Sequence, residues 1–161
     1  MRIRSSLPIF IRVNRRLDRI GRDLENARES RELIESCSDP RMLSRLDDSI
    51  GRSLHNIYCG IEGILHDFAL ELDGSVPASS RFHADLLEQI TTQLDSRPAL
   101  MPCSDALKSL MRYRHAFRNV YGESMHEDWL LEILESVENR ILPDLEAGLE
   151  NIRKFLEGEP E

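Results

Sequence analysis

The chain has 161 residues, of which 31% are charged and 40% hydrophobic, and its formal net charge at pH 7 is −8. This balance is typical of one globular domain and excludes a disordered chain, while the lack of an 18-residue apolar run excludes a transmembrane helix. Bulk attraction to nucleic acid is excluded by the acidic charge, so any such site must be a local basic patch.

Positive charge gathers at the start of the chain. The first 22 residues hold seven arginines and a single acidic residue, Asp18, so this segment carries a charge of +6 while the remainder carries −14. We interpret the segment as the start of a docked helix. An Arg-rich, acid-poor transit peptide is the alternative that the same composition allows.

Two long helices are predicted in the first half of the chain. The first runs from about Ile11 to Cys37, and the next begins at Pro40, because Asp39 can cap a helix and proline suits the first helical position. The second helix runs to about Leu72, where Gly74 and the proline beyond it are expected to end it, and we expect it to be the longest continuous helix, near 30 residues. Its apolar residues recur at steps of three and four, as one buried face requires: Leu43, Leu46, Ile50, Leu54, Ile57, Ile61, Ile64, Leu65, Phe68 and Leu72.

Three further helices are predicted in the second half. The third spans about Ser80 to Leu94 after a serine cap at position 79 or 80, and the fourth spans about Ser104 to Tyr121, with Ser104 as its cap. The fifth starts near Glu127 and extends as far as Leu156, with Pro143 expected to kink or split it. The sequence therefore predicts an all-α protein, an antiparallel up-and-down bundle of about five helices.

Motifs for metal or nucleotide triphosphate binding are absent from the sequence. None of the five histidines forms an HExxH pair, and no Gly-rich phosphate loop or GxSxG elbow occurs. We therefore expect no metal and no cofactor. The three cysteines, Cys37, Cys59 and Cys103, form no CxxC pair, and they predict buried, reduced thiols in a cytoplasmic protein.

The fourth predicted helix carries an arginine in the middle of its apolar stripe. The stripe is Leu107, Leu110, position 114, Phe117 and Tyr121, and position 114 is Arg. An isolated buried charge is very costly, so Arg114 must be paired or must lie in a cleft or at an interface. This placement, together with the long amphipathic helices, predicts a homodimer.

Other cationic and polar residues surround Arg114 on the same helix: Arg112, His115, Arg118 and Asn119. A charged surface with one buried ion pair explains them without a function. The functional interpretation is phosphate recognition or proton transfer, because arginine binds phosphate in a bidentate way and histidine exchanges protons near neutral pH. On the second helix, Glu62 could pair with Arg114 and orient it. A single histidine such as His83 is more often partly buried and hydrogen-bonded for structural reasons than catalytic.

Residues 114–122 (RHAFRNVYG) resemble the signature stretch of HepT-like proteins in the HEPN superfamily (higher eukaryote and prokaryote nucleotide-binding). The family motif is Arg, four to six residues, His, one residue and Tyr. Three more stretches are similar to family elements: LHNIYCGIEGIL at 54–65, LDGSVP at 72–77, and FHADLL at 82–87, which matches a Trp-His-x-x-Leu-Leu element. The resemblance covers about residues 43–155, within one domain that spans 1–161.

The resemblance implies a function as well as a fold. HepT-like proteins are homodimeric helical bundles, and many are toxins of toxin–antitoxin pairs that cut RNA as metal-independent endoribonucleases. Their usual antitoxin is a minimal nucleotidyltransferase, which in some pairs adenylylates the motif tyrosine. By that pattern, Arg114 matches the motif arginine and Tyr121 the tyrosine that the partner would modify.

The position of the motif histidine is Asn119, and an amide cannot act as a general base at neutral pH. His115, one helical turn earlier, is the residue that could replace it. The candidate catalytic residues are therefore Arg114, His115 and Asn119, with Arg112, Arg118 and Glu62 in support. Two hypotheses follow: a HepT-like protein that cuts RNA beside a nucleotidyltransferase antitoxin, and a non-catalytic dimeric interaction module of the same fold.

Overall fold

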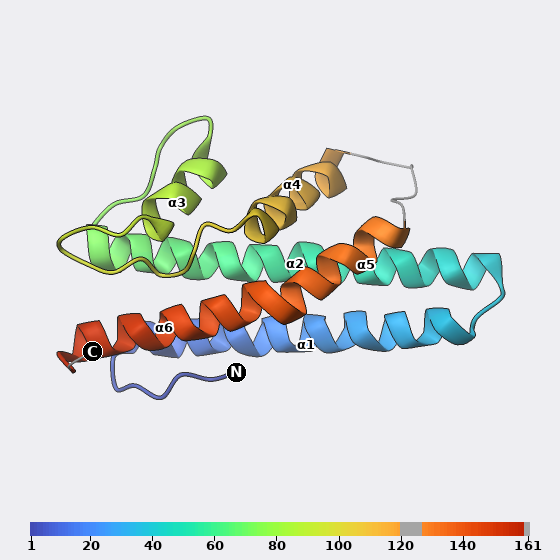
Figure 1. Cartoon of the computed structure of the whole chain (residues 1–161), viewed down its shortest axis with the longest axis horizontal. Coiled ribbons are helices and arrows are strands. Elements are labelled where there is room, and N and C mark those ends of the chain that lie inside the picture. The colour runs from blue at the N-terminus through green and yellow to red at the C-terminus, as the bar shows by residue number, and fades with distance from the viewer. Residues whose placement is uncertain (120–126, 160–161) are drawn as a thin grey trace.

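The computed structural model describes residues 1–119 and 127–159, and the side chains of all of these but residues 118, 119 and 127. Its helices are α1 (Pro8–Ser36), α2 (Pro40–Asp73), α3 (Phe82–Thr91), α4 (Asp105–Asn119), α5 (Glu127–Ser136) and α6 (Leu142–Glu157), with the π-helical turn η1 (Val137–Ile141) between the last two. Helices α1 and α2 form a long antiparallel hairpin, and α5, η1 and α6 form one rod beside it (Figure 1). The predicted all-α bundle is confirmed.

Helix α2 is the backbone of the bundle, and the expected boundary residues shape it. The Asp39 side chain accepts a hydrogen bond from the Arg41 backbone N–H at 3.0 Å, Pro40 occupies the first turn, and Gly74 ends the helix with a φ of 71°. The helix has 34 residues and continues unbroken through Gly60 and Gly63. It is the longest element of the described residues, as the stripe predicts.

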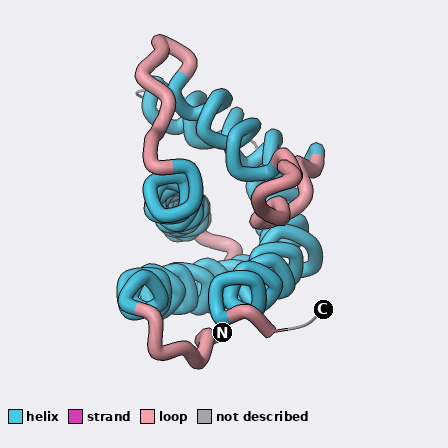
Figure 2. The backbone as a smooth tube through the Cα atoms, turned by 90° about the vertical axis from the view of Figure 1, so that its left-hand side faces the viewer, coloured by secondary structure: helices cyan, strands magenta, loops and turns pink. Residues whose placement is uncertain are grey.

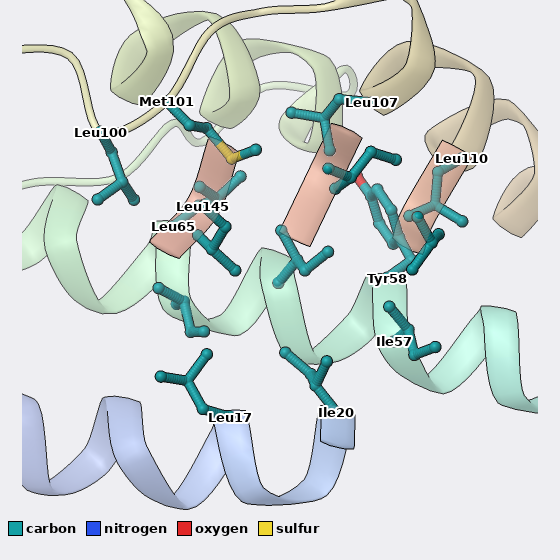
Figure 3. Packing of buried hydrophobic residues seen from close by; sticks show 14 of the residues in the cluster. Leu17, Ile20, Ile57, Tyr58, Leu65, Leu100, Met101, Leu107, Leu110 and Leu145 are labelled. Atoms are coloured by element: carbon teal, nitrogen blue, oxygen red, sulfur yellow. The ribbon is translucent and has the colours of Figure 1, made fainter. Parts of the chain in front are cut away.

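The core lies on both sides of α2. Figure 3 shows Leu17 and Ile20 of α1 below this helix, and Leu107 and Leu110 of α4 above it. Seen along the long axis, α3 and α4 lie on the side of α2 that faces away from α1 (Figure 2). The start of α4 follows the predicted cap, since the Leu107 N–H donates to the Ser104 hydroxyl at 3.2 Å. These contacts place one face of α4 directly over α2.

Helix α3 is shorter than the sequence predicts. It spans Phe82–Thr91, not residues 80–94, and its N-cap is Arg81, whose side chain makes no capping bond. The Ser79 hydroxyl instead accepts from the Arg81 N–H at 3.0 Å, in the turn before the helix. Beyond Thr91 the chain turns sharply, and the backbones of Leu94 and Arg97 bond to each other at 3.0 and 3.2 Å.

Arg97 explains that early end, because its buried side chain draws the chain back over the ends of α2 and α3. Nε and Nη2 donate to the two carboxylate oxygens of Asp73, at 2.5 and 2.7 Å. Nη2 also donates to the Gln89 carbonyl at 2.8 Å, and Nη1 donates to the Thr92 carbonyl at 2.9 Å. A single guanidinium thus joins the end of α2 to the end of α3.

The last predicted helix is split close to Pro143, as expected. Proline lacks a backbone N–H and cannot make the α-helical bond to the carbonyl four residues earlier. Just before Pro143 the helix widens into the π-helical turn η1, where the Leu142 N–H donates to the Val137 carbonyl, five residues earlier. Helix α6 then continues along α1 (Figure 1).

The N-terminal segment docks before α1 begins. Ile3 is buried, and the Asn14 side chain bonds both its N–H and its carbonyl at 2.8 Å. Two of the early arginines bind α2, Arg16 to Asp67 at 2.9 Å and Arg12 to Glu71 at 3.9 Å. No helix in the described parts of the chain has the length and apolar character to cross a membrane.

The prediction that all three cysteines are buried is wrong. All three thiols are free, but Cys103 is exposed and Cys37 and Cys59 are only half-buried. Cys103 lies in the loop before α4, two residues beyond the buried Met101. An apolar neighbour in the sequence does not bury a residue in a loop.

Glu138 gives the fold a pH-dependent link between η1 and α1. Arg28 donates to it at 2.6 Å and Arg31 at 2.8 Å, and its side chain is 12% exposed. Burial raises the pKa of Glu138, but the two arginines outweigh burial and leave this pKa below its usual value. The stability that the ionised carboxylate adds is therefore complete above its unfolded pKa of about 4.3, and is lost as the pH falls through the lower folded pKa.

We expect Glu138→Gln to lower the free energy of unfolding by about 2 kcal/mol at pH 7, because charged hydrogen bonds are lost. The difference from wild type should shrink as the pH falls below about 4.3 and through the lower native pKa, because the native carboxylate then gains a proton. Urea unfolding of both proteins across this range measures it. A difference in unfolding free energy between wild type and Glu138→Gln that stays constant down to pH 2 would contradict the ion-pair assignment.

Candidate functional site

Arg114 lies buried where α4 crosses α2 and the start of α3. Its side chain is only 9% exposed, and its guanidinium stands over the Tyr58 ring with 5.6 Å between the guanidinium carbon and the ring centre. The stripe position and the need for a partner, both inferred from the sequence, thus describe its environment correctly. The partners come from within the chain, so burial of Arg114 requires no second subunit.

Glu62 on α2 supplies the negative charge. Its carboxylate lies 3.9 Å from Nη2 of Arg114, so the two residues do pair as the sequence suggested. Burial raises the pKa of the Tyr58 phenol, and the adjacent Glu62 carboxylate raises this pKa further. Tyr58 therefore remains neutral and forms a wall of the site.

His83 completes the cluster from α3. One ring nitrogen, Nδ1, bonds the Glu62 carboxylate, and the other, Nε2, lies 3.1 Å from Nη1 of Arg114. Arg114, Glu62 and His83 therefore form a closed polar cluster, one residue from each of α4, α2 and α3. We call these three residues the RHE cluster.

His115 lies beside the RHE cluster and outside it. Its side chain is exposed, and its ring is 5.9 Å from the ring of His83, edge to face. Arg112 is exposed as well. The other site residues inferred from the sequence, Arg118, Asn119 and Tyr121, lie outside the residues whose side chains the structure describes.

His83 is the functional candidate that the sequence alone did not bring into the site. It stands 31 positions before Arg114 and on a different helix, so no helical periodicity connects the two. The signal that could have found it is the FHADLL stretch, in which His83 occupies the histidine position of the family element. The contact itself follows from how Arg97 holds α3 against the end of α2.

Tyr113, the residue before Arg114, anchors α4 on α2. This residue is fully buried, and its hydroxyl donates to the Gly51 carbonyl of α2 at 2.9 Å. Phe117 stacks on His55, with 5.1 Å between the ring centres. These contacts fix the rotation of α4 about its axis, and thereby aim the neighbouring Arg114 at Glu62 and His83.

The cluster has the parts of a phosphate and proton-transfer site. A guanidinium can stabilise negative charge on a phosphoryl group, and an imidazole can accept or release a proton. His83 is 27% exposed, so a ligand can reach its ring. Among the described residues, no group of three or more His, Cys, Asp or Glu side chains is arranged to hold a metal ion.

Comparison with protein families places this site within a known group. The family model described as "HepT-like protein" matches residues 49–156, which include α3, α4 and the RHE cluster. Searches of curated proteins and of solved structures give no match. Because the match covers about two thirds of the sequence and contains the whole site, the chain belongs to the HepT-like family.

Proposed function

We propose that this chain is the toxin partner of a minimal nucleotidyltransferase antitoxin, and that it cuts RNA as a metal-independent endoribonuclease in the cytoplasm. The observation that carries the proposal is the buried Arg114, paired with Glu62 and in contact with His83. Cleavage at a 2′-hydroxyl needs a proton acceptor and a cation for the charge that develops on phosphorus. Here the imidazole of His83 could accept the proton, and it lies within hydrogen-bond distance of the Arg114 guanidinium.

The partners in this proposal come from family membership and from the motif. HepT-like proteins pair across a shared groove, so we propose a homodimer that brings two RHE clusters close together. Tyr121 holds the position of the tyrosine that a nucleotidyltransferase modifies, and we propose it as the acceptor of an adenylyl group. A nucleotide attached there, seven residues beyond Arg114, would block the path of an RNA phosphate to the guanidinium.

A second candidate function is a non-catalytic dimeric interaction module. The observation in its favour is Asn119, which replaces the motif histidine and cannot take a proton at neutral pH. In that case the RHE cluster would stabilise the fold and hold α3 and α4 in place for a partner. The two functions differ in one measurable property, cleavage of RNA by the purified protein.

The test is incubation of purified protein with structured and single-stranded RNA in the presence of EDTA. We expect cleavage by wild type and a loss of about 10²- to 10³-fold in Arg114→Ala, the usual cost of removing a group that stabilises transition-state charge. Asn119→His should raise the rate if the missing motif histidine limits it. Lys108→Ala is the matched control, because Lys108 is an exposed cation on the same helix, paired only loosely with Asp105 at 3.9 Å.

The outcomes separate the two functions. Cleavage that Arg114→Ala removes and Lys108→Ala retains supports the ribonuclease. Intact RNA with both wild type and Asn119→His, while circular dichroism shows an unchanged fold, would reject the ribonuclease and leave the interaction module.

A further inference from the structure

We propose that His83 is the proton acceptor of the RNA cleavage reaction, and that Arg114 occupies its accepting nitrogen until a phosphodiester binds. This inference rests on the proposed ribonuclease function and names the residue that replaces the motif histidine. It differs from the sequence-based expectation, in which His115 takes that role.

The hydrogen bonds define which nitrogen of His83 carries the proton. A guanidinium only donates hydrogen bonds, so Nε2 of His83 must accept the bond from Nη1 of Arg114 at 3.1 Å. The proton of the ring is then on Nδ1, which donates to the Glu62 carboxylate. This is the neutral tautomer whose free lone pair can take a proton, and Glu62 holds the ring in it, as the orienting carboxylate does in a catalytic triad.

The surroundings of His83 favour it over His115 as the base. Glu62 of α2, and Arg114 and His115 of α4, face the ring, while Phe82 separates it from His66 of α2. On its own helix, the carboxylate of Asp85 bonds the Ser79 hydroxyl and lies 3.7 Å from Arg81. No carboxylate among the described residues is paired with His115 to select its tautomer. Of these two histidines, His83 is the one held on one side by a carboxylate and on the other by the cation that would bind substrate.

The reaction follows from a change of partner at Arg114. A bound phosphodiester draws the guanidinium N–H groups onto its non-bridging oxygens, because a charged acceptor binds them more strongly than a neutral imidazole. This frees Nε2 of His83. The imidazole takes the 2′-hydroxyl proton, the 2′-oxygen forms a bond to phosphorus, and the P–O5′ bond breaks. The 5′-oxygen keeps that electron pair and takes a proton from water, leaving a 2′,3′-cyclic phosphate and a 5′-hydroxyl.

The arrangement also links binding to activation. In the free protein the base is occupied by Arg114, so the 2′-hydroxyl of a nucleotide that has no phosphate on Arg114 finds no free acceptor. Phosphate recognition and proton transfer are therefore coupled through the single contact between Arg114 and His83. Glu62 is a positioning residue in this scheme, since it acts through the ring of His83.

The experiment compares cleavage by the full-length wild type, His83→Ala and His66→Ala, with and without added imidazole. We expect His83→Ala to lose about 10²-fold or more in kcat and to regain part of the rate when imidazole enters the vacated space. His66→Ala removes an imidazole from the neighbouring α2 position and should retain the wild-type rate. His83→Gln, which leaves Arg114 an acceptor but cannot shuttle a proton, should show the same loss if His83→Ala fails to fold.

The results separate this inference from the proposed function. Wild-type cleavage with an equally active His83→Ala would overturn the base assignment and leave the ribonuclease intact. If His83→Ala lost activity and added imidazole restored none of it, the base assignment would also be overturned, since His83 would then have a structural role. A wild type that leaves all RNA intact rejects the ribonuclease, and the base role of His83 falls with it.

The resting arrangement has its own readout, which needs no RNA. ¹⁵N NMR of the imidazole nitrogens in wild type should show a protonated Nδ1 and an accepting Nε2 on His83 at neutral pH. Glu62→Leu should lose this preference and populate both tautomers. A proton on Nε2 of His83 in the wild type would contradict the proposed contact with Arg114.

Discussion

Replacing Gly148 with alanine should lower the free energy of unfolding by about 3 kcal/mol or more and the melting temperature by about 10 °C. Gly148 lies in α6 where the loop before α4 crosses it. An added Cβ would stand 1.4 Å from the Leu100 carbonyl oxygen and 2.6 Å from its carbon. These are backbone atoms, so no side-chain rotation can relieve the clash. The loop must move away from α6, which exposes the buried Leu100 and Met101.

Gly21→Ala is the control for that prediction. Gly21 is also inside a helix, α1, but a Cβ at this position would meet nothing within 4 Å. The free energy of unfolding should rise by about 0.5–1 kcal/mol, because alanine loses less conformational entropy in a helix. Thermal unfolding followed by circular dichroism measures both variants. Equal melting temperatures for the two alanine variants would show that the loop does not lie against Gly148.

Arg97→Ala should cost about 3–5 kcal/mol of stability, the usual result when one partner of a buried ion pair is removed. The Arg97 side chain is 2% exposed, and it also satisfies backbone carbonyls at the end of α3. Its fork holds the pKa of Asp73 below the usual value. Without it, the Asp73 carboxylate keeps the bond from the Gln89 amide but loses its charged donor, and those carbonyls lose the bonds from the guanidinium. Arg97→Lys keeps the charge but not the fork, so an intermediate loss is expected.

Arg81→Ala is the matched control, since Arg81 is an arginine that precedes α3 while Arg97 follows it. Its side chain is 74% exposed and lies 3.7 Å from Asp85, so its removal should change stability by less than about 0.5 kcal/mol. Urea unfolding compares the three variants. If Arg97→Ala were as stable as Arg81→Ala, the joint between α2 and α3 would have to be held by other contacts. A displaced α3 should also separate His83 from Arg114.

Helix boundaries were predictable where a local signal decides them. The Asp39 cap, Pro40, Gly74 and the Ser104 cap act within a few residues, and the structure confirms each of them. The end of α3 was not predictable, because apolar periodicity continues to Leu94 while the buried Arg97 turns the chain after Thr91. The end of α3 is set by the ion pair between Arg97 and Asp73, which are 24 residues apart, and no local sequence pattern indicates such a contact.

The site shows the same division. A charge in an apolar stripe drew attention to Arg114, and Glu62 was one possible partner that the sequence offered, which the structure confirms. His83 looked structural because a single histidine on a short helix carries no periodic signal. The role that we propose for it rests on two contacts with residues of other helices, which only the packing of α3 reveals.

The sequence contains a second signal for the turn η1 besides Pro143, in the spacing of the core residues. Its core positions Val137, Ile141, Leu145 and Leu149 follow one another at three successive steps of four. In an ideal α-helix such a run drifts by about 40° at each step, because 3.6 residues complete a turn. A helix that keeps all four residues inward must therefore be wider somewhere, and the π-helical turn supplies that width.

The turn η1 consequently acts as a one-residue insertion that the helix absorbs. Its wider turn rotates the chain about as far as an α-helical turn with one residue fewer, so α6 keeps its phase. Deleting one of the exposed residues, Asn139 or Arg140, should therefore let ordinary α-helical bonds form throughout while the core residues of α6 still face inward. One residue inserted after Leu145 would instead rotate the rest of α6 by about 100° about its axis and turn Gly148 away from the loop before α4. The position of a length change along the rod thus decides whether the core tolerates it.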